Sequence, residues 1–193
     1  MSIESIELGD PAGVRRPGRP RARHLLIAVA AAGLGFQAIH SLEHLLQLGH
    51  WLLHPASPAW LTPWAAAGRD ALAAVTGQGP MTGMELLHLL GNAVFLAGLC
   101  ATLAVLGRDR ASQALVAVTW LQAAHLAEHV GLTVTTLLTG EAIGLTTGFG
   151  AVPPGPASTA LRVWAHFAIN LGLTLYALRG LRPFRPSDDL RKQ

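Results

Sequence analysis

Residues 25–53 read LLIAVAAAGLGFQAIHSLEHLLQLGHWLL, and this stretch decides the fold class. It exceeds the roughly 20 mostly apolar residues that a helix needs to cross a bilayer. Its second half nevertheless carries the imidazoles of His40 and His44 and the carboxylate of Glu43. An ionisable side chain at the bilayer centre costs at least about 2.5 kcal/mol, so such groups in a membrane helix mark a functional site.

The composition of the whole chain agrees with membrane residence. Of its 193 residues, 51% are hydrophobic and 13% are charged, and the charged share is about half that of a typical soluble domain. So few charges cannot cover a water-soluble globule, which excludes an ordinary cytosolic enzyme. The single cysteine, Cys100, excludes an intramolecular disulfide framework and a cysteine-based zinc cluster, and we expect it to be a small core residue.

We predict an all-α integral membrane protein, a four-transmembrane-helix bundle that occupies residues 24–182. Its helices are expected at about 25–53, 82–107, 112–139 and 159–181. The Pro-, Ala- and Trp-rich segment between the first two is expected to lie on the membrane surface, with a short helix near residues 65–75. Residues 1–23 are predicted to be a disordered basic tail, and residues 183–193 a second tail.

The distribution of basic residues predicts the orientation. Of 14 Lys and Arg residues, 12 lie in the N-terminal tail, in the turn Arg108–Arg110, or from Arg179 onward. The positive-inside rule then makes both termini cytoplasmic, in the cytoplasmic (inner) membrane, with the two longer loops outside. The bilayer is thus the predicted partner, and nucleic-acid binding is excluded because the basic residues form no folded face.

An internal repeat carries the polar residues. Gln37-Ala38-x-His40-x-x-Glu43-His44 recurs as Gln122-Ala123-x-His125-x-x-Glu128-His129, at an offset of 85 residues. The other two helices share His-x-x-x-Asn, at His88–Asn92 and His166–Asn170, at an offset of 78. The chain is therefore predicted to be two tandem helical hairpins in one orientation, related by an axis along the membrane normal.

Helical geometry brings these groups together. At 100° per residue the polar positions of each helix fall on one stripe. At about 1.5 Å per residue, all six repeat histidines lie roughly 20–30 Å above the cytoplasmic face. We therefore predict one polar layer in the outer half of the bundle, to which Glu43, Glu128 and Glu85 also belong.

Imidazole and carboxylate groups in one layer are the ligand set of divalent transition metals. A bound cation offsets the cost of burying the carboxylates and holds the imidazoles neutral. The ligand type resembles that of the di-iron carboxylate bundles, with more histidine. We predict two divalent transition-metal ions, with iron favoured over copper or zinc. The proposed partition is His40, His44 and His88 on one ion and His125, His129 and His166 on the other, with Glu43 and Glu128 bridging.

The sequence allows more than one role for several residues around this layer. His166 could equally serve the first ion, and Glu85 is included among the candidate ligands. Arg162 is expected to be a counter-ion for Glu85 or Glu128, a clamp for an anionic substrate, or an interfacial anchor. With Glu43 and Glu128 it completes the predicted catalytic set. Gln37, Asn92, Gln122 and Asn170 are expected to link helices and orient the ligating imidazoles.

Three functions are compatible with this pattern. The favoured one is a dinuclear-metal oxidoreductase that acts on a lipophilic or small substrate near the outer leaflet, with a membrane or periplasmic electron donor. The second is a b-type haem electron carrier with haem b as cofactor. The third is a zinc hydrolase, or a carrier or sensor of divalent metal ions. A structural hydrogen-bond network between helices is the non-functional alternative.

Overall fold

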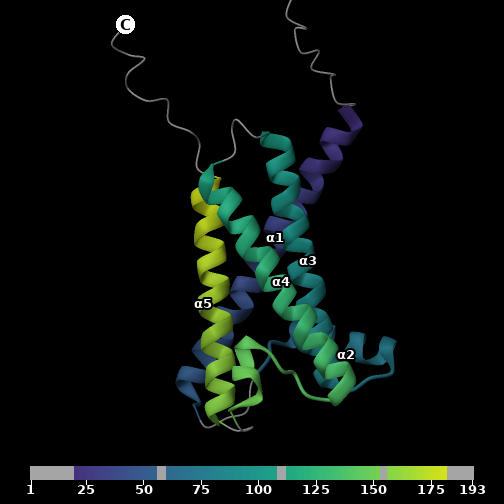
Figure 1. Ribbon diagram of the computed structural model, residues 1–193, viewed down its shortest axis with the longest axis vertical. Coiled ribbons are helices and arrows are strands. Elements are labelled where there is room, and N and C mark those ends of the chain that lie inside the picture. The colour runs from purple at the N-terminus through teal and green to yellow at the C-terminus, as the bar shows by residue number, and fades with distance from the viewer. Residues whose placement is uncertain (1–19, 56–59, 108–111, 153–155, 182–193) are drawn as a thin grey trace, which may run out of the picture.

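A computed structural model describes residues 20–55, 60–107, 112–152 and 156–181 (Figure 1). This part of the chain contains six helices and no strand, which confirms the all-helical prediction. The helices are α1 (Pro20–Leu53), α2 (Pro63–Thr76), α3 (Pro80–Leu106), α4 (Gln113–Thr139), the 3-10 helix η1 (Leu145–Gly150) and α5 (Pro156–Gly180).

The four long helices correspond to the four predicted ones, with ends that differ by a few residues. The largest difference is at α1, which begins at Pro20, inside the predicted tail of residues 1–23. The rest of that tail and the segment 183–193 lie outside the described residues. Helix α2 occupies the segment where a short helix near residues 65–75 was expected, and η1 was not predicted.

Capping residues set several of these ends. Helix α2 follows Thr62, whose hydroxyl accepts from the Ala65 N–H, and it has proline in its first turn. Ser112 does the same for α4 by accepting from the Leu115 N–H. Both helices end at a glycine in the left-handed conformation, Gly77 or Gly140, where a side chain would be strained.

The long helices run side by side in a closed ring of contacts (Figure 1). Helix α1 packs against α3 and α5, and α4 packs against the same two helices. Helix α2 packs on α3 and η1 packs on α5, and both lie at the same end of the long helices. The first turn of α1 and the last turn of α5 lie at the opposite end.

Several polar side chains lie inside this ring, and many large apolar side chains lie outside it. Gln122 and His129 are completely buried, whereas Trp120 and Leu138 on the same helix are 74% and 79% exposed. The same division holds on α1, where Gln37 and His44 are buried and Leu45 is exposed. A water-soluble protein shows the reverse distribution, and apolar surface of this extent marks contact with a membrane or a partner.

Apolar packing holds the helices together toward the end opposite α2. The buried cluster consists of residues from α3, α4 and α5: Phe95, Leu99, Leu115, Val118, Leu173 and Ala177. Helix α1 crosses α3 where Gly33 meets Gly98, and a Cβ added to Gly33 would lie 2.6 Å from the Gly98 Cα. Cys100, expected in the core, is exposed instead, because its position on α3 faces away from the other helices.

Among the described residues, α1 and α3 are long and apolar enough to cross a membrane. Their most apolar 18-residue windows have mean hydropathies of 1.8 and 2.2. Helices α4 and α5 do not reach the same composition, although their lengths are similar. On α4 the reason is a series of polar residues that includes Gln122, His125, Glu128 and His129.

Replacing Gly33 with alanine tests the helix crossing. We expect Gly33→Ala to lower the free energy of unfolding by about 1–3 kcal/mol, because the added methyl group overpacks against the α3 backbone. The measurement is thermal unfolding of the detergent-purified protein, followed by tryptophan fluorescence. Gly35→Ala is the control, since a Cβ at Gly35 has no neighbour within 4 Å. Equal stability of the two variants would contradict the crossing.

Candidate metal centre

Six histidines from the four long helices meet in one layer. His88 of α3 and His166 of α5 face each other with ring centroids 5.4 Å apart. His44 of α1 lies 5.5 Å from His166, and His129 of α4 lies 5.3 Å from His88. His40 and His125 stand one turn away, against His44 and His129 respectively. The repeat thus brings its imidazoles to one place.

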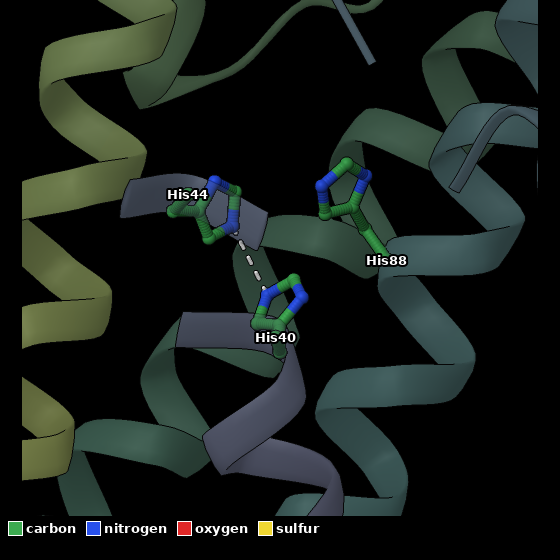
Figure 2. A group of neighbouring side chains, drawn as sticks. All are labelled: His40, His44 and His88. Carbon is green, nitrogen blue, oxygen red and sulfur yellow. Dashed lines mark hydrogen bonds between the residues drawn. The ribbon is translucent and has the colours of Figure 1, made fainter. Parts of the chain in front are cut away.

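Three of these histidines form a compact group (Figure 2). His40, His44 and His88 each offer a ring nitrogen, and these nitrogens all lie within 4.8 Å of one another. Nε2 of His40 and Nε2 of His44 are 3.2 Å apart. These three residues are the set assigned to the first ion from the sequence, and two α1 imidazoles one turn apart with one from α3 can hold a single cation.

The hydrogen bonds of two rings determine which nitrogen is free to ligate. Nδ1 of His88 lies 3.0 Å from the Met84 carbonyl oxygen, and Nδ1 of His166 lies 2.9 Å from that of Arg162. A carbonyl oxygen can only accept, so Nδ1 carries the proton in both rings and Nε2 keeps its lone pair. Each ring therefore presents Nε2 as its free lone pair.

The protonated nitrogen of His44 is also determined, here by a chain of two side-chain hydrogen bonds. Its Nδ1 lies 3.0 Å from Gln47 Oε1, and the Gln47 amide in turn donates to Glu43 at 3.0 Å. Because the Gln47 nitrogen faces a carboxylate, its oxygen must accept from His44 Nδ1. Nε2 of His44 is then an acceptor directed at His40 and at the centre of the group. Such outer partners orient ligating imidazoles in metal sites.

The second predicted set of histidines lies close by, and four of its ring nitrogens have no hydrogen-bond partner in the structure. Nε2 of His125, Nε2 of His166 and both ring nitrogens of His129 are buried without a hydrogen-bond partner in the structure. The His125–His129 pair repeats the His40–His44 geometry, with centroids 4.7 Å and 4.5 Å apart and an interplanar angle of 78° in both. Among the described residues, however, only the first set meets the distances of a metal-binding group.

The amide side chains of the repeat link the helices as expected. Gln122 of α4 donates to Asn92 Oδ1 of α3 at 2.9 Å, and Gln37 of α1 donates to Asn170 Oδ1 of α5 at 3.3 Å. Each asparagine donates to the carbonyl of the histidine one turn earlier, His88 or His166, at 2.9 Å. The four amides therefore hold the turns that carry the facing imidazoles.

Glu43 and Glu128 have neighbours other than the predicted ones. Glu43 accepts from the backbone N–H of Thr62 at 3.1 Å and also from the Thr62 hydroxyl. Glu128 accepts from the backbone N–H of Thr146 at 3.0 Å. Each carboxylate thus binds the start of the next helix, α2 for Glu43 and η1 for Glu128. No contact directs either carboxylate between two ions. On the helix, Glu43 is rotated by about 100° from His44, which turns it toward that segment.

Glu85 is the acidic group closest to the imidazoles. It is buried and accepts from Arg162 Nη2 at 2.7 Å, the contact expected of a counter-ion. Its second oxygen has no hydrogen-bond partner in the structure and lies 4.0 Å from His129 Nδ1. The pair joins α3 to α5 directly beside the histidine layer.

A cavity of about 360 Å³ leads to this layer from the end of the molecule that carries α2. His44, His88 and His166 lie on its inner wall, and Arg162 lies beside them. The remaining lining residues were not predicted from the sequence. Their spacing offered one signal, because Met81 and Met84 stand seven and four residues before His88 on the same face of α3. The other lining residues are Gln47, Trp60, Leu61, Arg69, Pro80, Ser158 and Val163.

Comparison with known proteins assigns the chain to a family. Residues 11–185 match DUF6008, a family of unknown function, and the chain therefore belongs to that family. No curated protein matches the chain. No solved structure matches it either.

Replacing Glu43 with alanine separates the two roles considered for this carboxylate. We expect Glu43→Ala to lower the free energy of unfolding by about 1–3 kcal/mol, because the buried Thr62 N–H and hydroxyl lose their acceptor. The metal content at saturating metal should not change, because Glu43 reaches His44 only through Gln47. Thermal unfolding and elemental analysis of the same preparation provide the two measurements.

Glu141→Ala is the matched control, since Glu141 is exposed in the segment after α4. It should alter neither quantity. Loss of metal from Glu43→Ala with unchanged stability would instead support a bridging carboxylate.

Proposed function

We propose that this member of the DUF6008 family is a membrane-embedded, histidine-ligated metalloprotein, and that it is a dinuclear-metal oxidoreductase. The observation that carries the proposal is the convergence of six imidazoles from α1, α3, α4 and α5, with unpartnered nitrogens at its centre. Hydrogen bonding between helices does not explain them, because a structural network would satisfy these nitrogens.

Membrane residence is supported by the distribution of side chains. The long helices bury their amides and imidazoles and expose leucine, valine and tryptophan. We propose that all four cross the membrane as a bundle, although composition alone identifies only α1 and α3. Helices α4 and α5 can carry more polar groups because those groups face the interior, where they contact one another rather than lipid.

A pair of ions is supported by the two halves of the site. His40, His44 and His88 already have the distances of one ligand group. His125, His129 and His166 hold four of the buried nitrogens without a hydrogen-bond partner, and each such group costs about 1–3 kcal/mol when left unsatisfied. A second cation bound by one nitrogen of each of the three rings would remove the cost of three of these four groups. We therefore keep the assignment of three histidines to each ion. His166 lies close enough to His44 that it could ligate the first ion instead of the second.

The chemistry follows from the ligands. Imidazole suits iron, copper and zinc, and of these iron and copper supply one-electron redox chemistry when bound. The cavity gives a small or lipophilic substrate access to His44, His88 and His166, and Arg162 lies in its wall. We propose Arg162 as the residue that orients the polar end of such a substrate, while Glu85 holds its guanidinium in place.

The alternative cofactor, haem b, has less support. A bis-histidine haem requires two imidazoles separated by a porphyrin plane. Here His88 contacts His129 and His166, so neighbouring rings occupy the space around each candidate axial ligand. A haem protein would show a Soret absorption band after purification, and its appearance would favour that function instead.

Elemental analysis tests the metal centre. We expect the anaerobically reconstituted wild-type protein to hold close to two iron or copper ions per chain, with redox-sensitive optical or paramagnetic signals. His88→Ala and His129→Ala should each lose about one ion, because each removes a ligand from a different half.

His24→Ala is the matched control, since His24 is exposed in the first turns of α1, away from the layer. It should retain both ions. Full metal content in both ligand variants would exclude the centre, and a bound but redox-silent ion would exclude the oxidoreductase.

Cysteine labelling tests the membrane arrangement. In a Cys100→Ser background, Val94→Cys places a thiol at an exposed position halfway along α3. We expect a membrane-impermeant maleimide to label it only after the membranes are dissolved in detergent, because lipid covers that face.

Glu141→Cys in the same background serves as the comparison. This position is exposed in the segment after α4 and should react in intact cells, from the outer side. Equal labelling of Val94→Cys before and after detergent would contradict membrane burial of α3.

A further inference from the structure

Both methionines of the described chain line the cavity that leads to the histidine layer. Methionine is rare here, with three in the whole sequence, of which Met81 and Met84 are the two in the described part. With His88 they stand at positions i, i+3 and i+7, which spans about 60° on the surface of α3. Over this distance the helix rises about 10 Å, so two thioethers precede the imidazole along one wall.

Apart from the neutral oxygens of Gln47 and Ser158, the side-chain donor atoms of this cavity are of two kinds. Thioethers are contributed by Met81 and Met84, and ring nitrogens by His44, His88 and His166 at the inner end. Nε2 of His166 is buried and has no hydrogen-bond partner in the structure. No carboxylate and no thiol lies among the lining residues, all of which belong to the described part of the chain. A hard divalent cation would find no anionic oxygen there.

The charges in the lining also select against divalent cations. The lining includes the guanidinium groups of Arg69 and Arg162. Each is paired with a carboxylate outside the lining, Asp70 at 2.8 Å and Glu85 at 2.7 Å. The residual repulsion on a cation grows with its charge, so it is half as large for a monovalent ion as for a divalent one.

We propose that this cavity binds Cu(I), with Met81 and Met84 as thioether ligands toward its mouth and the His40–His44–His88 group as the imidazole site at its inner end. Soft, neutral thioethers bind Cu(I), whereas iron, zinc and manganese are held by imidazole, carboxylate or thiolate ligands. This inference rests on the proposed function and identifies its metal as copper, in place of the iron favoured from the sequence. Copper enters along α3 and needs no carboxylate ligand.

The test is Cu(I) binding to the full-length, detergent-purified protein, in anaerobic competition with the chromophoric chelator bicinchoninate. The variant is Met81→Leu/Met84→Leu, because leucine keeps the apolar volume and removes only the sulfur atoms. We expect its Cu(I) affinity to fall by about tenfold or more, at least the loss that an outer partner of a metal site causes. Its affinity for Co²⁺, read from the visible spectrum, should be unchanged within about twofold, because Co²⁺ uses the imidazoles.

The outcomes separate this inference from the proposed function. Unchanged affinity for both ions would overturn the thioether site and leave the histidine centre intact. An equal loss for Cu(I) and Co²⁺ would also overturn it, because the methionines would then act through packing. A wild-type protein that binds neither ion would remove both proposals. A loss confined to Cu(I), with loss of copper–sulfur scattering in X-ray absorption, would support it.

Discussion

The structure depends on the burial of imidazole nitrogens among helices whose backbones are already hydrogen-bonded. A helix satisfies its own N–H and C=O groups, so it offers a buried side chain few partners besides other side chains. His88 and His166 each use a carbonyl one turn earlier for Nδ1, which leaves Nε2 directed inward. His129 has no such partner on either nitrogen. Bringing these lone pairs together costs free energy when no ion is bound. A shared cation, as proposed, would make the same arrangement favourable, because it would bind several lone pairs at once.

The two halves of the repeat share this arrangement but not all its details. Gln–Asn and Glu–Thr contacts recur in both halves with nearly the same partners. The differences lie around the inner histidines. Gln47, which orients His44, corresponds to Leu132, so His129 loses its partner and faces Glu85 instead. Met84 corresponds to Arg162, so one wall of the cavity carries a sulfur where the other carries a charge. A symmetric scaffold thereby supports two unequal halves.

The sequence predicted the elements well because their signals are local. Long apolar segments defined α1, α3, α4 and α5, and the repeat with 100° per residue predicted that His40, His44 and His88 would meet. The hydrogen-bond partners of Glu43 and Glu128 could not be predicted in the same way. They depend on where Thr62 and Thr146 come to lie, and the loops before those residues carry no periodicity from which this could be derived. The cavity was missed for the same reason, because its walls come from α1, α2, α3, α5 and a loop.

The two halves differ in how the segment after their first helix lies against the histidine layer. Helix α2 packs on α3, and the cavity opens where α2 and the segment before it meet the ends of α3 and α5. The corresponding segment of the second half is η1, which packs on α5, and Gly144 just before it approaches the Glu128 carboxylate so closely that a Cβ would clash. In the second half the backbone thus lies directly against the Glu128 carboxylate, whereas in the first half a cavity reaches His44 and His88. Under the proposed function, an ion or substrate that enters this cavity would meet His44, His88 and His166 first, because these three histidines line it and His125 and His129 do not.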